Sequence, residues 1–157
     1  MAKETRATRA LSKAGIAFSV HSYEYDPAAA SIGLQAASAL GEPPERVLKT
    51  LMALVDGKPA CAIVPANSEV AMKKLAAALG GKAATMMKPA DAERLSGYKV
   101  GGISPFGQMK PVRAVVDASA LAQPHVYLNG GQRGLQIRMA PQDAVTCLSA
   151  IVAAITA

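Results

Sequence analysis

Lys49 is the residue whose type and surroundings most directly suggest chemistry in this sequence. It stands in a nearly continuous apolar run, residues 47–55, that carries no other charge. If this run is a strand, both faces beside Lys49 hold apolar side chains, and burying an unpaired ammonium is costly. Such a lysine must be paired, must open onto a pocket that accepts an anion, or must lose its proton. The structural alternative is a lysine at the start of a strand that reaches water along its own methylene groups.

Two glycine-rich segments could bring backbone N–H groups close to a ligand. Residues 101–107 contain three glycines and one proline, and residues 129–134 contain three more glycines. The first segment is not a Walker loop, because no Gly-Lys-Ser/Thr follows, and not a dinucleotide fingerprint, because no helix follows at the required spacing. On spacing alone, an ordinary tight connection between strands explains each segment at least equally well.

The chain lacks the familiar sets of catalytic nucleophiles. His21 and His125 have no motif partner, and no Gly-x-Ser-x-Gly sequence occurs. Cys61 and Cys147 have neither Cys-x-x-Cys nor Cys/His spacing, so no zinc site or disulfide framework is indicated. Both cysteines are interpreted as buried thiols. If the protein is an enzyme, we expect it to stabilise its substrate rather than attack it.

Composition limits the class of protein. A chain of 157 residues with 51% hydrophobic and 18% charged residues predicts one folded domain spanning 1–157. The formal net charge of +6 makes an anionic partner plausible, whereas 4% aromatic residues argue against a broad base-stacking platform of the RNA-recognition kind. No apolar run reaches the length of a membrane span, and the charged N-terminus does not fit a secretory signal. A cytoplasmic protein with no membrane partner is therefore expected.

Periodicity and turn residues predict the elements that must position these groups. Helices are predicted over residues 4–14, 31–40 and 90–96, over a segment capped by Asn67 or Ser68 that ends before Gly80, and after Pro141. Strands are predicted over residues 18–25, 47–55, 60–64, 83–87, 112–116, 126–128 and 135–139, with a tight hairpin turn at Asp56-Gly57. The expected fold is α+β (mixed α/β), a six- to seven-stranded barrel-like mixed sheet flanked by helices.

Five segments, in order along the chain, resemble the YbaK/EbsC family. They are His21-Ser22-Tyr23, Leu48-Lys49-Thr50-Leu51, the run Tyr98-Lys99-Val100-Gly101-Gly102-Ile103-Ser104-Pro105-Phe106-Gly107-Gln108, Gly130-Gly131-Gln132-Arg133-Gly134 and Ala140-Pro141-Gln142-Asp143. The similarity extends from the first predicted helix to the last. One such tripeptide would be weak support, whereas five in family order make the resemblance strong.

The resemblance implies a free-standing editing domain that hydrolyses cysteine wrongly attached to proline tRNA, Cys-tRNA(Pro). In the YbaK type, the thiol of the substrate attacks its own ester carbonyl, cyclises and expels the tRNA 3′ end, while the protein positions the ester. This chemistry would account for the missing protein nucleophile, and it implies no cofactor and no metal. It also implies two partners, the aminoacyl-tRNA(Pro) and, in a transient complex, prolyl-tRNA synthetase.

The resemblance also implies roles for individual residues. Lys49 would bind or orient the anionic adenosine end, and Gly101 and Gly102 would act in catalysis through their backbone. The implied substrate-binding residues are Tyr23, Ile103, Ser104, Pro105, Phe106, Asn129, Gly130, Gly131 and Asp143. The family often has serine where this chain has Asn129, and a carboxylate in the first turn of a helix explains Asp143 equally well.

Two alternatives remain open from the sequence. The first is a deacylase for Ala-tRNA(Pro) or for a broader set of aminoacyl-tRNAs. Because alanine has no thiol, that enzyme would need a water activated by the pocket. The second is a non-catalytic module that has kept the fold and binds tRNA or the synthetase.

Overall fold

The structure, a computed structural model, describes residues 4–29 and 31–157. Within these ranges the helices are α1 (Arg6–Lys13), α2 (Ile32–Leu40), α3 (Met72–Ala78), α4 (Pro89–Ser96) and α5 (Pro141–Leu148), with short 3-10 helices η1 (Pro44–Arg46) and η2 (Ala118–Ala122). The strands are β1 (Ser19–Ser22), β2 (Leu48–Val55), β3 (Lys58–Pro65), β4 (Ala84–Met86), β5 (Arg113–Asp117), β6 (Val126–Asn129), β7 (Leu135–Met139) and β8 (Ile151–Ala153). None of the helices in this part of the chain has the length and apolar character that a membrane crossing requires.

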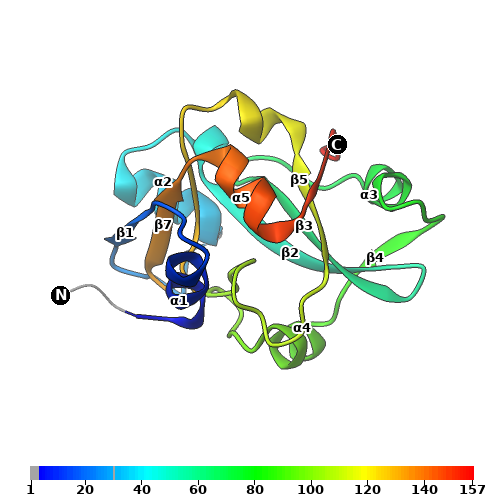
Figure 1. Cartoon of the computed structure of the whole chain (residues 1–157), viewed down its shortest axis with the longest axis horizontal. Coiled ribbons are helices and arrows are strands. Elements are labelled where there is room, and N and C mark those ends of the chain that lie inside the picture. The colour runs from blue at the N-terminus through cyan, green and yellow to red at the C-terminus, as the bar shows by residue number, and fades with distance from the viewer. Residues whose placement is uncertain (1–3, 30) are drawn as a thin grey trace.

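The strands form two sheets that lie side by side (Figure 1). A three-stranded antiparallel sheet has the order β1-β7-β6, and a five-stranded mixed sheet has the order β4-β2-β3-β5-β8. A single parallel bridge between Val47 and Tyr127 joins them just before β2 begins. The mixed α/β class is therefore confirmed. The described strands nevertheless form two sheets rather than one barrel-like sheet, and no closed barrel is found among them.

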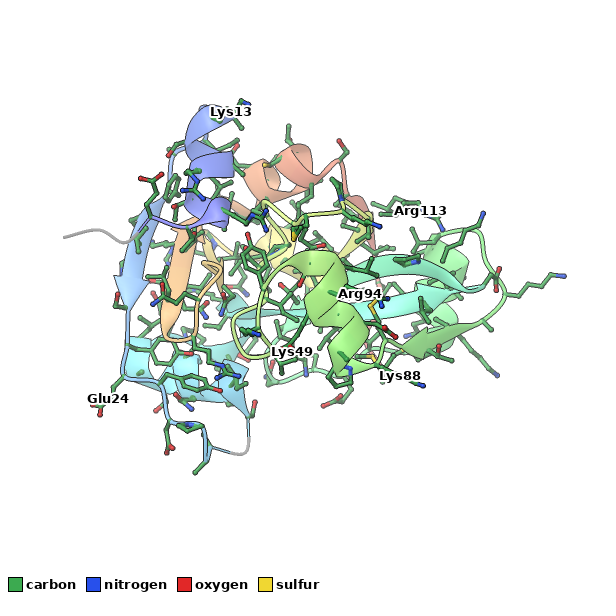
Figure 2. The ribbon with its side chains drawn as sticks, turned by 90° about the horizontal axis from the view of Figure 1, so that it is seen from below. Lys13, Glu24, Lys49, Lys88, Arg94 and Arg113 are labelled. Carbon is green, nitrogen blue, oxygen red and sulfur yellow. The ribbon has the colours of Figure 1, made fainter. Side chains whose placement is uncertain are left out.

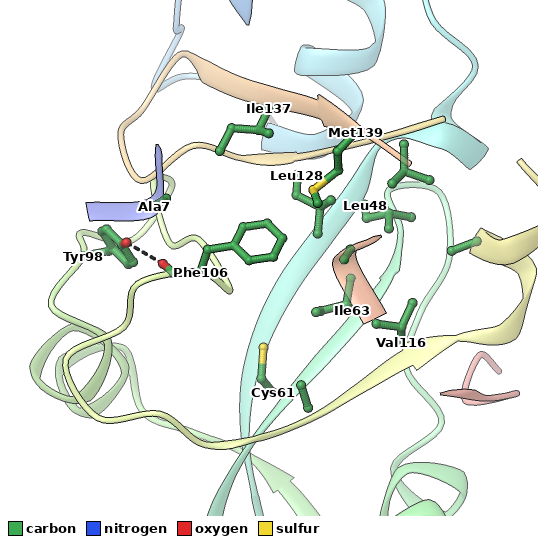
Figure 3. Packing of buried hydrophobic residues seen from close by; sticks show 14 of the residues in the cluster. Ala7, Leu48, Cys61, Ile63, Tyr98, Phe106, Val116, Leu128, Ile137 and Met139 are labelled. Atoms are coloured by element: carbon green, nitrogen blue, oxygen red, sulfur yellow. Dashed lines mark hydrogen bonds between the residues drawn. The ribbon is translucent and has the colours of Figure 1, made fainter. Parts of the chain in front are cut away.

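The main hydrophobic core fills the space between the two sheets and is covered by α1 and α5. A second apolar cluster occupies the opposite face of the five-stranded sheet, beneath α3. Phe106 is buried in the main core near Leu128 and Met139, and the Tyr98 hydroxyl donates a 2.6 Å hydrogen bond to the Phe106 carbonyl (Figure 3). Both ends of the glycine-rich loop at 101–107 are thus anchored in the core, which limits how far the loop can move.

The hairpin of β2 and β3 positions Lys49. Asp56 and Gly57 both have positive φ, 50° and 80°, as the two-residue turn of an Asp-Gly hairpin requires. The resulting register sets Lys49 opposite Val64. Alternate residues of β2 enter the two different cores, as the apolar pattern predicted, so a slip by one residue would move every side chain into the wrong core.

Capping residues fix the starts of α1 and α2. Thr5 and Thr8 form a reciprocal capping box, and the Thr5 hydroxyl also donates a 2.6 Å hydrogen bond to the Gly130 carbonyl. Ser31 accepts a 3.3 Å hydrogen bond from the Leu34 N–H at the start of α2, which ends at Gly41 with φ of 67°. The hydrogen bond from Thr5 to Gly130 ties the start of α1 to the second glycine-rich loop.

Several local predictions were wrong. Helix α3 begins after Ala71 without a side-chain cap, because the chain after Ser68 first pairs with the C-terminal segment through a bridge between Val70 and Thr156. The Asn67 amide donates a 2.9 Å hydrogen bond to Glu45. The first strand ends at Ser22 rather than at residue 25. Strand β8 was not predicted, because three residues paired only through their backbone carry too little pattern. Cys61 is buried as expected, but Cys147 is only partly buried.

A polar cluster ties the chain after α2 to β6. The Glu42 carboxylate accepts a 2.8 Å hydrogen bond from the Tyr127 hydroxyl, lies 3.2 Å from the His125 ring and pairs with Arg46 at 3.3 Å. The Tyr127 hydrogen bond is the largest cause that lowers the pKa of Glu42; burial opposes it, and His125 and Arg46 lower it further. This cluster holds the C-terminal end of α2 against the three-stranded sheet.

We expect Glu42→Gln to reduce the free energy of unfolding by about 1–2 kcal/mol near neutral pH, because hydrogen bonds to a charged acceptor are replaced by neutral ones. The folded-state pKa lies below the ordinary value of 4.5, so the stabilisation is present above that value and is lost as the pH falls through the folded-state pKa. Urea denaturation of both proteins across this range measures the difference. The exposed Glu24, changed to Gln, is the control. A difference that persists unchanged in strong acid would contradict the assignment.

Candidate functional site

A cavity of about 290 Å³ opens where the two sheets meet. Its walls come from β2, the N-terminal end of α2, the region of α4, the glycine-rich loop at 101–107 and the adjoining ends of β6 and β7. Most of the lining is apolar, with Leu48, Met52 and Ile103 among its members. This volume is near the lower end of small-ligand sites, which range over about 300–1,000 Å³. The cavity therefore suits a small group rather than a large rigid ligand.

Lys49 is the only charged residue among the described residues that line the cavity. Its side chain is 23% exposed, and its ammonium lies 3.7 Å from the carboxylate of Glu69, whose side chain is 86% exposed. Figure 2 shows Lys49 between α4 and the segment that contains α2. A contact this long with so exposed a carboxylate leaves the ammonium available to an incoming anion.

The loop at 101–107 presents backbone to the cavity through Gly101 and Ile103. Gly101 has a φ of 91°, a conformation that favours glycine. The Gly102 N–H donates a 2.8 Å hydrogen bond to the Lys99 carbonyl. Within the described residues, the N–H groups of Gly101 and Ile103 make no hydrogen bond. Of the described loop residues that line the cavity, Gly101 and Ile103 thus keep N–H groups that are free to donate, whereas the Gly102 N–H is already paired.

Gly102 has a different part in the site, because it lies directly against the second glycine-rich loop. A Cβ atom at this position would lie 2.8 Å from the backbone nitrogen of Arg133 and 3.0 Å from the carbonyl carbon of Gln132. The absence of a side chain lets the two loops meet backbone to backbone.

Asn129 joins the same two loops through its side chain. Its Nδ2 donates a 3.2 Å hydrogen bond to the Gly101 carbonyl, and its Oδ1 accepts hydrogen bonds of 2.7 Å from Gly131 and 3.2 Å from Gln132. The amide is therefore engaged at both ends. In this structure Asn129 holds Gly101 in place, although it also lines the cavity.

Two polar residues that line the cavity were not predicted from the sequence to belong to the site. Thr50 Oγ1 and Gln136 Oε1 are buried and make no hydrogen bond within the described part of the chain. Buried polar groups without a partner are rare in proteins, so these two atoms mark the lining as a place where a polar partner is missing. Gln136 lies on the same face of β7 as Arg138, which predicts a solvent face. Only the pairing of Gln136 with Asn129 on β6 places it at the cavity.

Other predicted site residues lie further from the cavity. Tyr23 is not among its lining. Its buried hydroxyl lies by the Gln136 side chain without a hydrogen bond of good geometry in the described residues; burial is the main cause that raises the pKa of Tyr23, and the Gln136 side chain lowers it. Ser104 is buried and its hydroxyl accepts a 3.2 Å hydrogen bond from Phe106 N–H. Gly130 and Gly131 form the turn that Thr5 and Asn129 hold.

Pro105 and Phe106 line a second cavity, of about 220 Å³, behind the glycine-rich loop. Asp143 lies in the first turn of α5 and is not among the described residues that line either cavity. The structure thus brings Lys49, Gly101, Ile103 and Asn129 together, with Gly102 in support, and leaves Asp143 apart.

The lining of the first cavity holds no Cys, His, Asp or Glu among the described residues. Cys61 and Cys147 line the second cavity instead, and burial raises the pKa of Cys61 to about 12, so it remains a protonated thiol near neutral pH. No group of three His, Cys, Asp or Glu suited to a metal ion is found in the described ranges. The site can therefore hold an anionic ligand and orient its polar groups, but no strong nucleophile of the protein faces it.

Comparisons with known proteins give a family match over most of the chain. A family model described as the aminoacyl-tRNA editing domain matches residues 26–147. EbsC of Enterococcus faecalis (strain ATCC 700802 / V583), named as a candidate Cys-tRNA(Pro)/Cys-tRNA(Cys) deacylase, is 29% identical over 121 residues, 76% of this chain and 74% of that protein.

Two solved structures share the fold. A candidate trans-editing enzyme for prolyl tRNA synthetase superposes with a TM-score of 0.84 at 24% identity, covering 99% of each chain. The hypothetical protein APE2540 superposes with a TM-score of 0.87 at 22% identity, covering 98% of this chain and 100% of that chain. At these identities the two superpositions establish the fold alone.

Proposed function

The chain belongs to the family of aminoacyl-tRNA editing domains, and on that premise we propose that it removes cysteine from mischarged Cys-tRNA(Pro). The family makes it an aminoacyl-tRNA deacylase, consistent with the name of its Enterococcus faecalis relative. That name includes cysteine on two different tRNAs, which supports recognition of the amino acid more than of the tRNA body.

The cavity at Lys49 is the observation that carries the proposal. Its described lining offers one ammonium, two loop N–H groups and two unpartnered polar atoms, but no Cys, His, Asp or Glu. An ester that reacts here needs a nucleophile from elsewhere. Cysteine is an amino acid whose ester carries a nucleophile of its own.

The proposed reaction is an intramolecular transfer within the substrate. The thiol sulfur attacks the ester carbonyl, an S–C bond forms, the C–O bond to the terminal ribose breaks, and the thiol proton passes to the departing ribose oxygen. Water then opens the cyclic thioester and gives free cysteine. Positioning of sulfur and carbonyl lowers the barrier, because it replaces a search over many conformations.

The residues of the cavity would divide this work between them. Lys49 binds the anionic end of the tRNA, and the N–H groups of Gly101 and Ile103 stabilise negative charge on the carbonyl oxygen. Gly102 and Asn129 hold these donors in place. Gln136 Oε1 is an acceptor for the α-ammonium group of the aminoacyl ester.

The remaining substrate-binding residues implied by the resemblance would act mainly by supporting the walls of the cavity at Lys49 from outside its lining. These residues are Tyr23, Ser104, Pro105, Phe106, Gly130 and Gly131, while Asp143 would contact the tRNA outside the cavity.

The choice of proline tRNA would come from a transient complex with prolyl-tRNA synthetase. A net charge of +6 attracts tRNA without reading its sequence, and such binding weakens steeply with salt. Deacylation of Cys-tRNA(Pro) should then become selective over other cysteinyl-tRNAs only when the synthetase is present.

The test compares tRNA(Pro) charged with cysteine, S-methylcysteine, alanine and proline. We expect the protein to clear the cysteine ester and to spare the S-methylcysteine ester, because a methylated sulfur cannot cyclise. If the protein removes alanine and leaves cysteine attached, its substrate is Ala-tRNA(Pro) and not Cys-tRNA(Pro). Equal clearance of cysteine and S-methylcysteine would keep the deacylase and reject cyclisation. Binding of tRNA without any deacylation would favour a non-catalytic module.

Glu69→Gln is expected to lower KM for Cys-tRNA(Pro) by about two- to fivefold with kcat unchanged. The Glu69 carboxylate competes with the substrate for Lys49, and exposed pairs of this kind contribute about 0.2–1 kcal/mol. Steady-state deacylation at low ionic strength measures the effect, with Glu24→Gln as the matched control for loss of one exposed negative charge. An unchanged KM would show that Glu69 does not compete for this lysine.

A further inference from the structure

Tyr25 and Arg133 form a pair beside the cavity. The guanidinium carbon of Arg133 lies 5.6 Å from the centroid of the Tyr25 ring. Arg133 Nε donates a 2.9 Å hydrogen bond to the carbonyl of Val100, which lines the cavity. The described residues provide Arg133 with no carboxylate within salt-bridge distance. An exposed planar cation is thus held in a defined orientation without its charge being neutralised.

The pair lies directly against Gly101. A Cβ atom at Gly101 would lie 3.0 Å from the Tyr25 hydroxyl oxygen, 3.2 Å from Arg133 Nε and 3.3 Å from Ile32 Cδ1. Gly101 and Ile32 line the cavity, whereas Tyr25 and Arg133 do not. The two side chains therefore stand at the rim, beside the loop that would hold the aminoacyl ester.

The fold fixes this rim from behind. The Gly134 carbonyl accepts a 2.9 Å hydrogen bond from Tyr23 N–H, and a Cβ atom at Gly134 would lie 3.4 Å from Tyr25 Cβ. The segment that carries Tyr25 and the loop that carries Arg133 are thus packed together. A flat ligand that stacks here meets a surface that is already organised, so little conformational entropy is lost on binding.

We propose that Tyr25 and Arg133 form the stacking surface for the purine base of the terminal nucleoside of the tRNA, a proposal that rests on the function proposed above. The aminoacyl group is joined to the ribose of that nucleoside. When the ester occupies the cavity, its base must therefore lie just outside. Single-stranded bases stack on aromatic rings and on guanidinium planes, and they do so without reading sequence.

A stacking surface of this size is compatible with the low aromatic content of the chain. Few aromatic residues exclude a broad stacking platform, but a single terminal base needs only one ring and one planar cation. Base stacking would also give the enzyme affinity for the end of every tRNA, independently of the tRNA body.

The test uses two small substrates, adenosine carrying a 3′-cysteinyl ester and cysteine methyl ester, which has no base. Tyr25→Leu and Arg133→Lys should each lower kcat/KM for cysteinyl adenosine by about tenfold and leave cysteine methyl ester unaffected. Arg133→Lys keeps the positive charge and removes the planar guanidinium group. Tyr25→Phe keeps the ring and should lose less than Tyr25→Leu. Arg138→Lys changes an exposed arginine on β7 and should behave as wild type. Equal losses with both substrates, or a harmless Arg133→Lys, would overturn the proposal.

Direct binding makes the outcome independent of turnover. Adenosine titrated into the wild-type protein should shift the NMR signals of the Tyr25 ring and of Arg133 Nε–H, whereas ribose 5-phosphate should not. In Tyr25→Leu, adenosine should shift the Arg133 Nε–H signal more weakly. If adenosine binds as expected but neither ester is cleaved, the stacking surface stands and the proposed function fails. Shifts caused by ribose 5-phosphate alone would identify a phosphate site and overturn stacking.

Discussion

Replacement of Lys49 by alanine is expected to lower kcat/KM for Cys-tRNA(Pro) deacylation about 100-fold or more. Lys49 is the only charged residue among the described residues of the cavity lining, so nothing there replaces its charge. Without that charge the anionic end of the tRNA is no longer held in place, and a misplacement of the reacting ester by about 1 Å costs about 10²-fold in rate. Single-turnover deacylation measures the loss directly.

Stability should change little in the same variant. The only partner of the Lys49 ammonium in the described residues is the exposed Glu69 carboxylate at 3.7 Å, so no buried charge is left unpaired. We expect the free energy of unfolding to stay within about 1 kcal/mol of wild type. A large loss of stability would mean that the lysine is structural.

Lys73→Ala is the matched control, because it removes one positive charge from the exposed side of α3, away from the cavity. A general loss of attraction to tRNA would affect both variants and would grow weaker at high salt. A loss confined to Lys49→Ala and insensitive to salt assigns the effect to the cavity. Equal losses in the two variants would contradict that assignment.

Local sequence pattern was sufficient to predict the strand that carries Lys49. Asp56-Gly57 favours the positive φ values of a two-residue hairpin turn, and the apolar residues of β2 alternate between two cores. Both signals act over a few residues, so neither depends on the rest of the fold. The place of Lys49 near the start of a strand with two buried faces follows from them, whereas the cavity beside it depends on the rest of the fold.

The same local patterns could not predict which distant segments of the chain pair with one another. The division into two sheets depends on which strands meet, and the single bridge at Val47 is one residue long. Gln136 reaches the cavity only because β7 lies between β1 and β6. The distance of Asp143 from the cavity lining likewise follows from where α5 packs, and not from its own sequence.

Gly102→Ala is expected to lower the rate of deacylation about 100-fold while leaving the composition of the lining unchanged. The added methyl group would lie 2.8 Å from the backbone nitrogen of Arg133 and 3.0 Å from a backbone carbon of Gln132. Backbone atoms cannot rotate away from the added methyl group as the end of a flexible side chain can, so one of the two glycine-rich loops must move. A displacement of about 1 Å between reacting groups and their donors costs about 10²-fold in rate.

The same change should also reduce the free energy of unfolding, by about 1–3 kcal/mol, because an extra methyl group strains a packed contact. Gly80→Ala separates that cost from the effect on catalysis. Gly80 has a φ of 73°, and a Cβ atom there would meet nothing within 4 Å, so its replacement strains the backbone without a clash at the cavity. Gly80→Ala should lose stability and keep its rate. A Gly102→Ala protein as active as Gly80→Ala would show that catalysis does not depend on the close meeting of the two glycine-rich loops.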